Sequence, residues 1–429
     1  MKKVLIISYY FPPMGMGGVQ RALKFAKYLP SFGWQPIILT VKDVDYFAKD
    51  YTLLDELPSD VKIIRTGSLD PLRLSYLLKR ITRKTKESQG ETYTPLKAKI
   101  LSWFFFPDNK IGWFPFALVK GINICKKEKV DLILSTSPPP SCHLIGYVLK
   151  RLCGKPWVAD FRDLWFGPQY EFFPTPLHTA ARKIIEKTIS KNADAIVTVN
   201  HKITEYIQGY SPKTIETIFN GYDREDFNFE IKKPTDRFTI LHFGTFGPGL
   251  NPEPFFKALS NLIRKKLINS NNIKFIKTGQ TIGLNLQSLL DKYNLKDITQ
   301  TLGYVSSHKG ALQILAQADL LLLITSLSPQ SKYVTPGKVY EYLAANRPIL
   351  AIVPEDSSAA QIIQFTQTGK VISPDRIEEI EKAILDYYQN YLEKRSGLKP
   401  NRAEINKFER KYLTSKLATL FDRTIQLSC

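Results

Sequence analysis

The stretch DLLLLITSLSPQSKYVTPGKVYEYLAANRPILAIV (residues 319–353) places a helical pattern between two apolar runs. The runs 319–324 and 348–353 are continuous rather than alternating, which is typical of strands in a parallel sheet covered on both faces. Pro336 suits the first turn of a helix, because its missing N–H needs no partner there. The stretch therefore predicts a strand, a helix and a second parallel strand.

Similar runs recur along the whole chain, and helical patterns separate most of them. At 429 residues the chain is long enough for two domains of roughly 200 residues each. We therefore predict an α/β fold of two doubly wound, Rossmann-like domains, with the junction in the polar stretch 200–237. The expected strands are 3–8, 36–41, 61–66, 131–136, 157–161, 194–199, 238–244, 273–279, 299–305, 319–324 and 348–353.

Composition indicates a globular protein, with 43% hydrophobic and 12% aromatic residues. The four cysteines have no paired spacing, so we interpret them as reduced thiols of a cytoplasmic protein. The start MKKVLIISYYFPP lacks a cleavage site for a signal peptide and is read as a first buried strand. No apolar stretch approaches the roughly 20 residues that span a bilayer.

The net charge of +20 is concentrated in the first half, most densely over residues 73–99. A basic surface attracts nucleic acid, anionic lipid or phosphorylated substrates, and a merely soluble basic face is the simpler alternative. No nucleic-acid-binding motif is present. The aromatic cluster WFFFPDNKIGWFPF (103–116) is either core or a face that meets a membrane.

Glycines follow the first expected strand and precede a helix. Backbone N–H groups of Gly15, Gly17 and Gly18 could bind an anion at the start of that helix. Gln20 stands where a dinucleotide fingerprint has its third glycine, so this is not such a fingerprint. The alternative is a loop that needs glycine for its backbone angles.

Three charged residues, Asp160, Arg162 and Asp163, follow the expected strand 157–161. A carboxylate beside an arginine could receive a proton from an acceptor hydroxyl or bind its phosphate. The alternative is a structural Asp–Arg pair at the edge of the sheet. In open α/β sheets ligands lie at the carboxyl ends of strands, so we predict that the segment 135–144 lines the same site.

We expect His143 to pack rather than to react. With five histidines and no zinc-binding pattern, we expect no metal site.

The helix start at 336–341 combines an exposed backbone with two charges. Gly337 lets a ligand approach, and Lys338 adds a positive charge to the helix N-terminus. Glu341 lies three residues later on the same face and could accept hydrogen bonds from ribose hydroxyls. These features predict a nucleoside-diphosphate pocket, with a surface Lys–Glu pair as the alternative.

Gly244 and Thr245 stand between a strand and a helix, another place that suits a phosphate. Asn220 belongs to an Asn-Gly turn at the domain junction and is a candidate donor-binding residue.

The order of these motifs resembles the GT-B-fold glycosyltransferases of family 4, most closely the bacterial branch that builds surface polysaccharides. The resemblance spans nearly the whole chain, and 303–351 is its most specific part. It implies a GT-B fold whose C-terminal domain holds a nucleotide sugar and whose N-terminal domain binds the acceptor. It also implies a last helix that returns to the first domain, for which 407–425 is suited. We therefore predict domains at 1–205, with a crossover helix over about 405–429, and at 206–404.

Carried onto this chain, the resemblance assigns Glu341 to the ribose and Lys338 to the pyrophosphate. Gly17 and Gly18 match glycines that face the donor phosphates, and Tyr304 lies in a segment that contacts the base. Asp160 stands near the place where the family presents an acid or a histidine to the transferred sugar.

The chain departs from the family at two places. Tyr333 stands where the first glutamate of the Glu-x7-Glu signature is expected. The Arg/Lys pair expected soon after Gly244 is missing, and Lys257 is a weak substitute. Both departures fall among residues that contact the sugar and the diphosphate rather than the ribose and base.

The resemblance implies transfer with retention of configuration and without a metal ion or cofactor. The expected partners are a nucleotide sugar and a saccharide acceptor, which the basic first domain suggests is lipid-linked. A cytoplasmic place is expected, with peripheral contact to an anionic membrane left open. A nucleotide-sugar epimerase or hydrolase of the same fold, and a polyanion-binding protein, are the alternatives.

Overall fold

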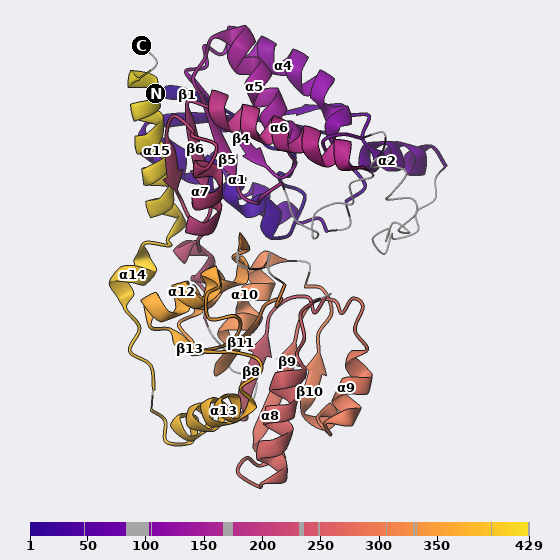
Figure 1. The fold of residues 1–429 in the computed structure, drawn as a ribbon, viewed down its shortest axis with the longest axis vertical. Helices are drawn as coiled ribbons and strands as arrows, with labels where there is room; N and C mark the ends of the chain where they lie inside the picture. Colours follow the sequence, from indigo (N-terminus) through magenta and orange to yellow (C-terminus); the bar gives the residue numbers. More distant parts are fainter. Residues whose placement is uncertain are drawn as a thin grey trace. The chain divides into compact units, whose positions relative to one another are not determined.

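The computed structural model describes residues 1–46, 48–82, 103, 105–165, 175–230, 236–247, 249–305, 307–328, 331, 333–395 and 397–427. The chain forms two compact units (Figure 1). Unit 1 consists of 1–219 and 411–429, and unit 2 of 220–410.

Unit 1 contains a seven-stranded sheet in the order β3-β2-β1-β4-β5-β6-β7, with every neighbouring pair parallel. Its strands are β1 (Lys2–Ile7), β2 (Trp34–Val41), β3 (Lys62–Thr66), β4 (Leu132–Ser137), β5 (Trp157–Phe161), β6 (Ala195–Thr198) and β7 (Ile215–Thr217). Its described helices are α1 (Gly17–Tyr28), α2 (Pro71–Thr82), α4 (Phe114–Lys127), α5 (Ser141–Cys153), α6 (Pro176–Asn192), α7 (His201–Gln208) and α15 (Arg410–Gln426).

Unit 2 contains a six-stranded parallel sheet in the order β10-β9-β8-β11-β12-β13. Its strands are β8 (Phe238–His242), β9 (Ile273–Lys277), β10 (Thr299–Thr301), β11 (Leu320–Ile324), β12 (Ile349–Ile352) and β13 (Gly369–Ile372). Its described helices are α8 (Glu253–Arg264), α9 (Leu286–Lys292), α10 (His308–Ala316), α11 (Lys338–Ala345), α12 (Ser358–Thr366), α13 (Ile377–Leu392) and α14 (Arg402–Asn406), with the short 3-10 helix η4 (Arg224–Phe227) before them.

The predicted fold class is confirmed: two parallel sheets with helices between the strands form two Rossmann-like domains. Strands buried on both faces produce this pattern, and β4, β5, β11 and β12 are buried at every position. The prediction missed β7 and β13, which are short, incompletely buried edge strands.

The last helix, α15, packs on unit 1, and Figure 1 shows it beside β1 and α7. Leu413, Leu417 and Phe421 join the core formed by the first strands, and the ring of Phe421 meets Trp34 edge to face at 5.1 Å. Burial of such side chains contributes roughly 1.5–3 kcal/mol each. The C-terminal segment is therefore an integral part of unit 1.

Two sequence features of unit 1 are described only in part. Residues 83–99 of the basic stretch lie outside the described residues. In the aromatic cluster, Trp113 is buried, whereas Trp103 and Phe116 are exposed. None of the described helices is both long and apolar enough to cross a membrane.

Candidate active site

Each sheet reverses its strand order at one place, between β1 and β4 in unit 1 and between β8 and β11 in unit 2. Ligands of open α/β sheets bind outside the carboxyl ends of the strands at such a reversal. In unit 2, Gly244 follows β8, and Lys338 begins the helix after β11. Two residues predicted from the sequence therefore flank the expected ligand position of this unit.

The loops after β8, β9 and β10 support one another. The Gly244 N–H donates to Thr278 Oγ1 at 3.0 Å, and the Gly279 N–H donates to the Gly303 carbonyl at 3.1 Å. Gly279 has φ +74°, and a Cβ there would lie 2.8 Å from the carbonyl carbon of Gly244. Only glycine fits this position without a shift of the β8 loop. Sequence reasoning did not identify Gly279, although Thr278 and Gly279 ended a predicted strand.

Lys338 reaches the loop after β8. A Cβ on Gly244 would lie 3.3 Å from Lys338 Nζ, so the missing side chain of this glycine leaves room for the ammonium group. Withdrawal from water lowers the pKa of Lys338 to about 8, with a further lowering by Lys277, whereas the carboxylate of Glu341 acts in the opposite direction. The predicted neighbours Gly244 and Lys338 are thus brought together.

Glu341 lies in the first turn of α11, where an acid is favoured by the helix dipole. Burial raises the pKa of its carboxyl group, with Asp226 adding to the effect, while His308, Arg410 and Lys338 act against it. Glu341 is therefore surrounded by charges from several segments of unit 2. Sequence reasoning did not identify Asp226, His308 or Arg410, because they come from segments separated along the chain.

Of the other predicted donor residues, Thr245, Tyr304, Gly337 and Asn220 belong to the same unit, whereas Gly17 and Gly18 belong to unit 1. Thr245 follows Gly244 in the loop after β8, and its backbone nitrogen would lie 3.1 Å from a Cβ added to Gly279. Tyr304 follows Gly303, and 43% of its surface is exposed. Gly337 is exposed and has no neighbouring atom within 4 Å of a Cβ position. Asn220 is the first residue of unit 2.

Lys277 supplies a second ammonium group near Lys338. Its Nζ donates to the carbonyls of Gly279 and Gln280 at 2.6 Å each, and to Thr281 Oγ1 at 2.9 Å. Burial lowers its pKa to about 8. Lys277 therefore holds the loop after β9 in place, a function that the sequence alone did not reveal.

His242, at the end of β8, is buried and neutral. Its ring stacks on Phe246 at 4.2 Å, and its Nδ1 lies 3.1 Å from the Leu322 carbonyl. Burial, with Lys338 and Lys277 nearby, lowers its pKa well below the ordinary value. The imidazole packs under the β8 loop.

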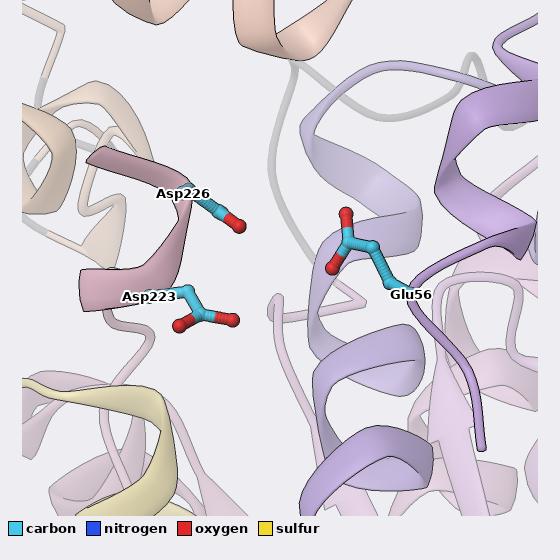
Figure 2. A group of neighbouring side chains, drawn as sticks. All are labelled: Glu56, Asp223 and Asp226. Atoms are coloured by element: carbon cyan, nitrogen blue, oxygen red, sulfur yellow. The ribbon is translucent and has the colours of Figure 1, made fainter. Parts of the chain in front are cut away.

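Two acids of unit 2, Asp223 and Asp226, lie on or beside η4, and Figure 2 shows both side chains. Asp223 caps η4 by accepting from the Glu225 N–H at 3.1 Å. Asp226 Oδ2 lies 3.5 Å from His308 Nε2. Glu56, also drawn in Figure 2, belongs to unit 1, where it accepts from Lys24 Nζ at 2.6 Å. Each of these carboxylates thus has a partner within its own unit.

In unit 1 the glycine loop opens α1 at the carboxyl end of β1. Gly17 and Gly18 are exposed, and nothing lies within 4 Å of a Cβ position on Gly17. Arg162 Nη1 donates to the Gly18 carbonyl at 2.6 Å. The structure therefore joins two predicted elements, the glycine loop and the charged end of β5.

Asp160 is fully buried and is held by Arg21 of α1. Arg21 Nη2 lies 2.8 Å from Asp160 Oδ1, Arg21 Nε lies 3.0 Å from Oδ2, and Thr136 Oγ1 donates to Oδ2 at 2.8 Å. Arg21 also donates to the carbonyls of Ile218 and Phe219 at 2.9 Å each. This geometry matches the structural Asp–Arg pair weighed as the alternative, with Arg21 as the partner.

Asp163 lines a cavity of about 270 Å³ in unit 1, at the carboxyl ends of β1, β4 and β5. The cavity also has the residues Tyr10, Asp108, Asn109, Ser137, Pro138, Pro139, Pro140, Leu164, Trp165 and Arg182 in its wall. The segment 135–144 thus reaches the same cavity as Asp163, in agreement with its expected place.

Two buried groups beside this cavity have structural partners. His143 packs against Phe161, with ring centres 4.5 Å apart, and burial lowers its pKa to about 3. Asp108 accepts from the Ser141 N–H at 2.6 Å and the Lys110 N–H at 2.8 Å, and burial raises its pKa. Asp163, which is less buried, is the acid of this cavity that remains a candidate for chemistry.

Two family models match the chain in succession. Residues 16–226 match Glycosyltransferase Family 4, and residues 223–404 match Glycosyl transferases group 1. No curated protein sequence matches the chain.

Solved structures of low sequence identity share the fold over nearly the whole length. A glycosyltransferase from Rickettsia africae is 17% identical, covers 99% of each chain and has a TM-score of 0.62. Anabaena Alr3699/HepE, in complex with UDP and glucose, is 14% identical, covers 98% of this chain and 100% of its own, and has a TM-score of 0.62. The apo lipopolysaccharide outer core galactosyltransferase WaaB is 13% identical, covers 98% and 99%, and has a TM-score of 0.56.

The two family models together extend over both units, and the two Rossmann-like domains match GT-B structures. The chain is a glycosyltransferase with the GT-B fold.

Proposed function

We propose that this enzyme transfers a sugar from a nucleoside-diphosphate sugar to a saccharide acceptor, and that unit 2 binds the donor. The observation that carries the proposal is the position of Lys338. Its ammonium group borders Gly244 at the strand reversal of unit 2, and Glu341 follows on the same helix.

The chemistry of this place suits a nucleoside diphosphate. Lys338 and the N-terminus of α11 both favour a negative charge, so the diphosphate would lie beside them. Glu341 has only acceptor oxygens when ionised, which suits the two hydroxyl groups of a ribose. Tyr304 offers an exposed ring for the base. The related Anabaena structure contains UDP and glucose.

The acceptor is assigned to unit 1. The cavity beside Asp163 combines an acid, an arginine and the indole of Trp165, a set of groups that can bind sugar hydroxyls and a sugar face. A lipid-linked acceptor in surface-polysaccharide synthesis agrees with the basic stretch 73–99 and with the similarity to WaaB.

We further propose retention of configuration, as the resemblance to family 4 implies. A metal ion would not be needed, because Lys338 would supply the positive charge that the departing diphosphate needs. The leaving diphosphate would then help to deprotonate the acceptor hydroxyl. This assignment leaves Asp160 and Arg162 to hold the glycine loop and β5 together, and places Asp163 nearest to the acceptor.

The test is a thermal-shift panel of UDP, GDP, ADP and dTDP with the purified protein. A nucleotide at about 100 times its Kd stabilises the fold by about 2.7 kcal/mol, so we expect a clear rise in Tm with one of the four. No rise with any of them would contradict the proposal. Consumption of the matching nucleotide sugar without an acceptor would instead favour an epimerase or a hydrolase.

A further inference from the structure

Glu341 lies among charged side chains of unit 2, Asp226, His308 and Arg410, to which the donor-binding assignment gives no role. The helix η4 packs against both α10 and α11. It presents Asp226, whose Oδ2 lies 3.5 Å from Nε2 of His308, the first residue of α10. Both residues act electrostatically on Glu341 of α11: His308 lowers the pKa of its carboxyl group and Asp226 raises it. Three separate elements of unit 2 therefore place charged or titratable groups at one location.

The fourth member, Arg410, comes from the segment by which the chain leaves unit 2. The chain enters this unit at Asn220 and leaves it after Arg410. Within unit 2 the two segments are joined by backbone hydrogen bonds, from the Tyr222 N–H to the Phe408 carbonyl at 3.0 Å and from the Arg410 N–H to the Tyr222 carbonyl at 2.8 Å. Asp226 and Arg410 therefore come from the segments by which the chain enters and leaves unit 2, and these segments are joined by backbone hydrogen bonds.

The charges of this cluster balance one another. Asp226 and Glu341 are both acids, and like charges at close range destabilise each other's ionised forms. A positive charge on His308 attracts both carboxylates, and Arg410 adds a permanent positive charge near Glu341. Lys338, on the same helix, acts on Glu341 in the same sense as Arg410, and Arg224 of η4 is paired with Glu409 at 3.6 Å.

We propose that Asp226, His308 and Arg410 are positioning residues that hold the Glu341 carboxylate ready for the donor. The proposal rests on the donor-binding function above and assigns three further residues to it. His308 is the central one, because its charge offsets the repulsion between Asp226 and Glu341. Without that charge, only Arg410 and Lys338 would offset the repulsion from Asp226, so the Glu341 carboxylate would be held less firmly for the nucleotide, and neutralising Asp226 as well would restore part of the binding.

The test is a double-mutant cycle with His308→Gln and Asp226→Asn, read by calorimetric titration of the nucleoside diphosphate that gives the largest thermal shift. We expect His308→Gln to weaken binding about fivefold at pH 6, and the double variant to recover most of that loss.

His201→Gln is the matched control. His201 is also the first residue of a helix, α7, but belongs to unit 1, and we expect its replacement to leave affinity unchanged. Equal affinity of wild type and His308→Gln at pH 6, or a loss that the second substitution does not recover, would overturn the proposal while leaving the donor assignment intact. Absence of nucleotide binding by the wild type would overturn both.

Discussion

Replacing Glu341 with alanine is expected to abolish nearly all of the nucleotide-induced thermal stabilisation. Hydrogen bonds to a charged group contribute about 1.5–3 kcal/mol each, so losing the carboxylate should weaken binding about 100-fold. At a concentration that is about 100 times the wild-type Kd, the stabilisation would fall from about 2.7 to about 0.4 kcal/mol. The expected effect is large because removing this half-buried acid would leave the ribose hydroxyls without an acceptor.

The matched control is Glu378→Ala, since Glu378 is an exposed acid in the first turn of another unit 2 helix, α13. It should leave the thermal shift unchanged. Asp160→Ala should also retain the shift in whatever fraction folds, because Asp160 lies in unit 1 and is paired there with Arg21. If Asp160→Ala removed the shift and Glu341→Ala kept it, the roles assigned to these two acids would be wrong.

Replacing Arg21 with methionine is expected to destabilise unit 1 by about 3–5 kcal/mol. The substitution leaves Asp160 as a fully buried carboxylate without its bidentate partner, and breaking a buried pair from one side has a cost of this order. It also leaves the carbonyls of Ile218 and Phe219 without their donor.

All five tryptophans of the chain lie before residue 166 and therefore in unit 1, so urea denaturation followed by tryptophan fluorescence reports on this unit. Lys2→Met is the control, since Lys2 forms an exposed ion pair with Asp422 and its loss should cost less than about 1 kcal/mol. A fluorescence midpoint for Arg21→Met equal to that of Lys2→Met would show that the buried pair does not stabilise unit 1.

The fold could be predicted from the sequence because parallel strands that are buried on both faces appear in it as continuous apolar runs. The run 157–161 coincides with β5, and 319–324 contains β11. Most edge strands lack this signal: β13 has a single buried residue, and β10, predicted over 299–305, spans only three residues that are not buried. The apolar pattern follows burial, so it identified the central strands. Of the edge strands it found β3 (Lys62–Thr66, predicted as 61–66), predicted β10 too long, and missed β7 and β13.

The residues of the candidate site could be predicted from the sequence only where they are close together in the chain. Lys338 and Glu341 lie one helical turn apart, and helix geometry places them on one face. The partner of Asp160 is 139 residues away in Arg21, so the sequence suggested its neighbour Arg162 instead. His308, Asp226 and Arg410 likewise act on the charge of Glu341 from three other segments of the chain, which no local sequence pattern encodes.

The central claim is that unit 2 binds the donor nucleotide at its strand reversal, and hydrogen–deuterium exchange with and without the stabilising nucleotide tests it most directly. We predict slower exchange of the amides at 244–245 and 337–341 in the bound protein, with unchanged exchange in α13. Protection confined to unit 1 or to α13, with 244–245 and 337–341 unaffected, would contradict the account.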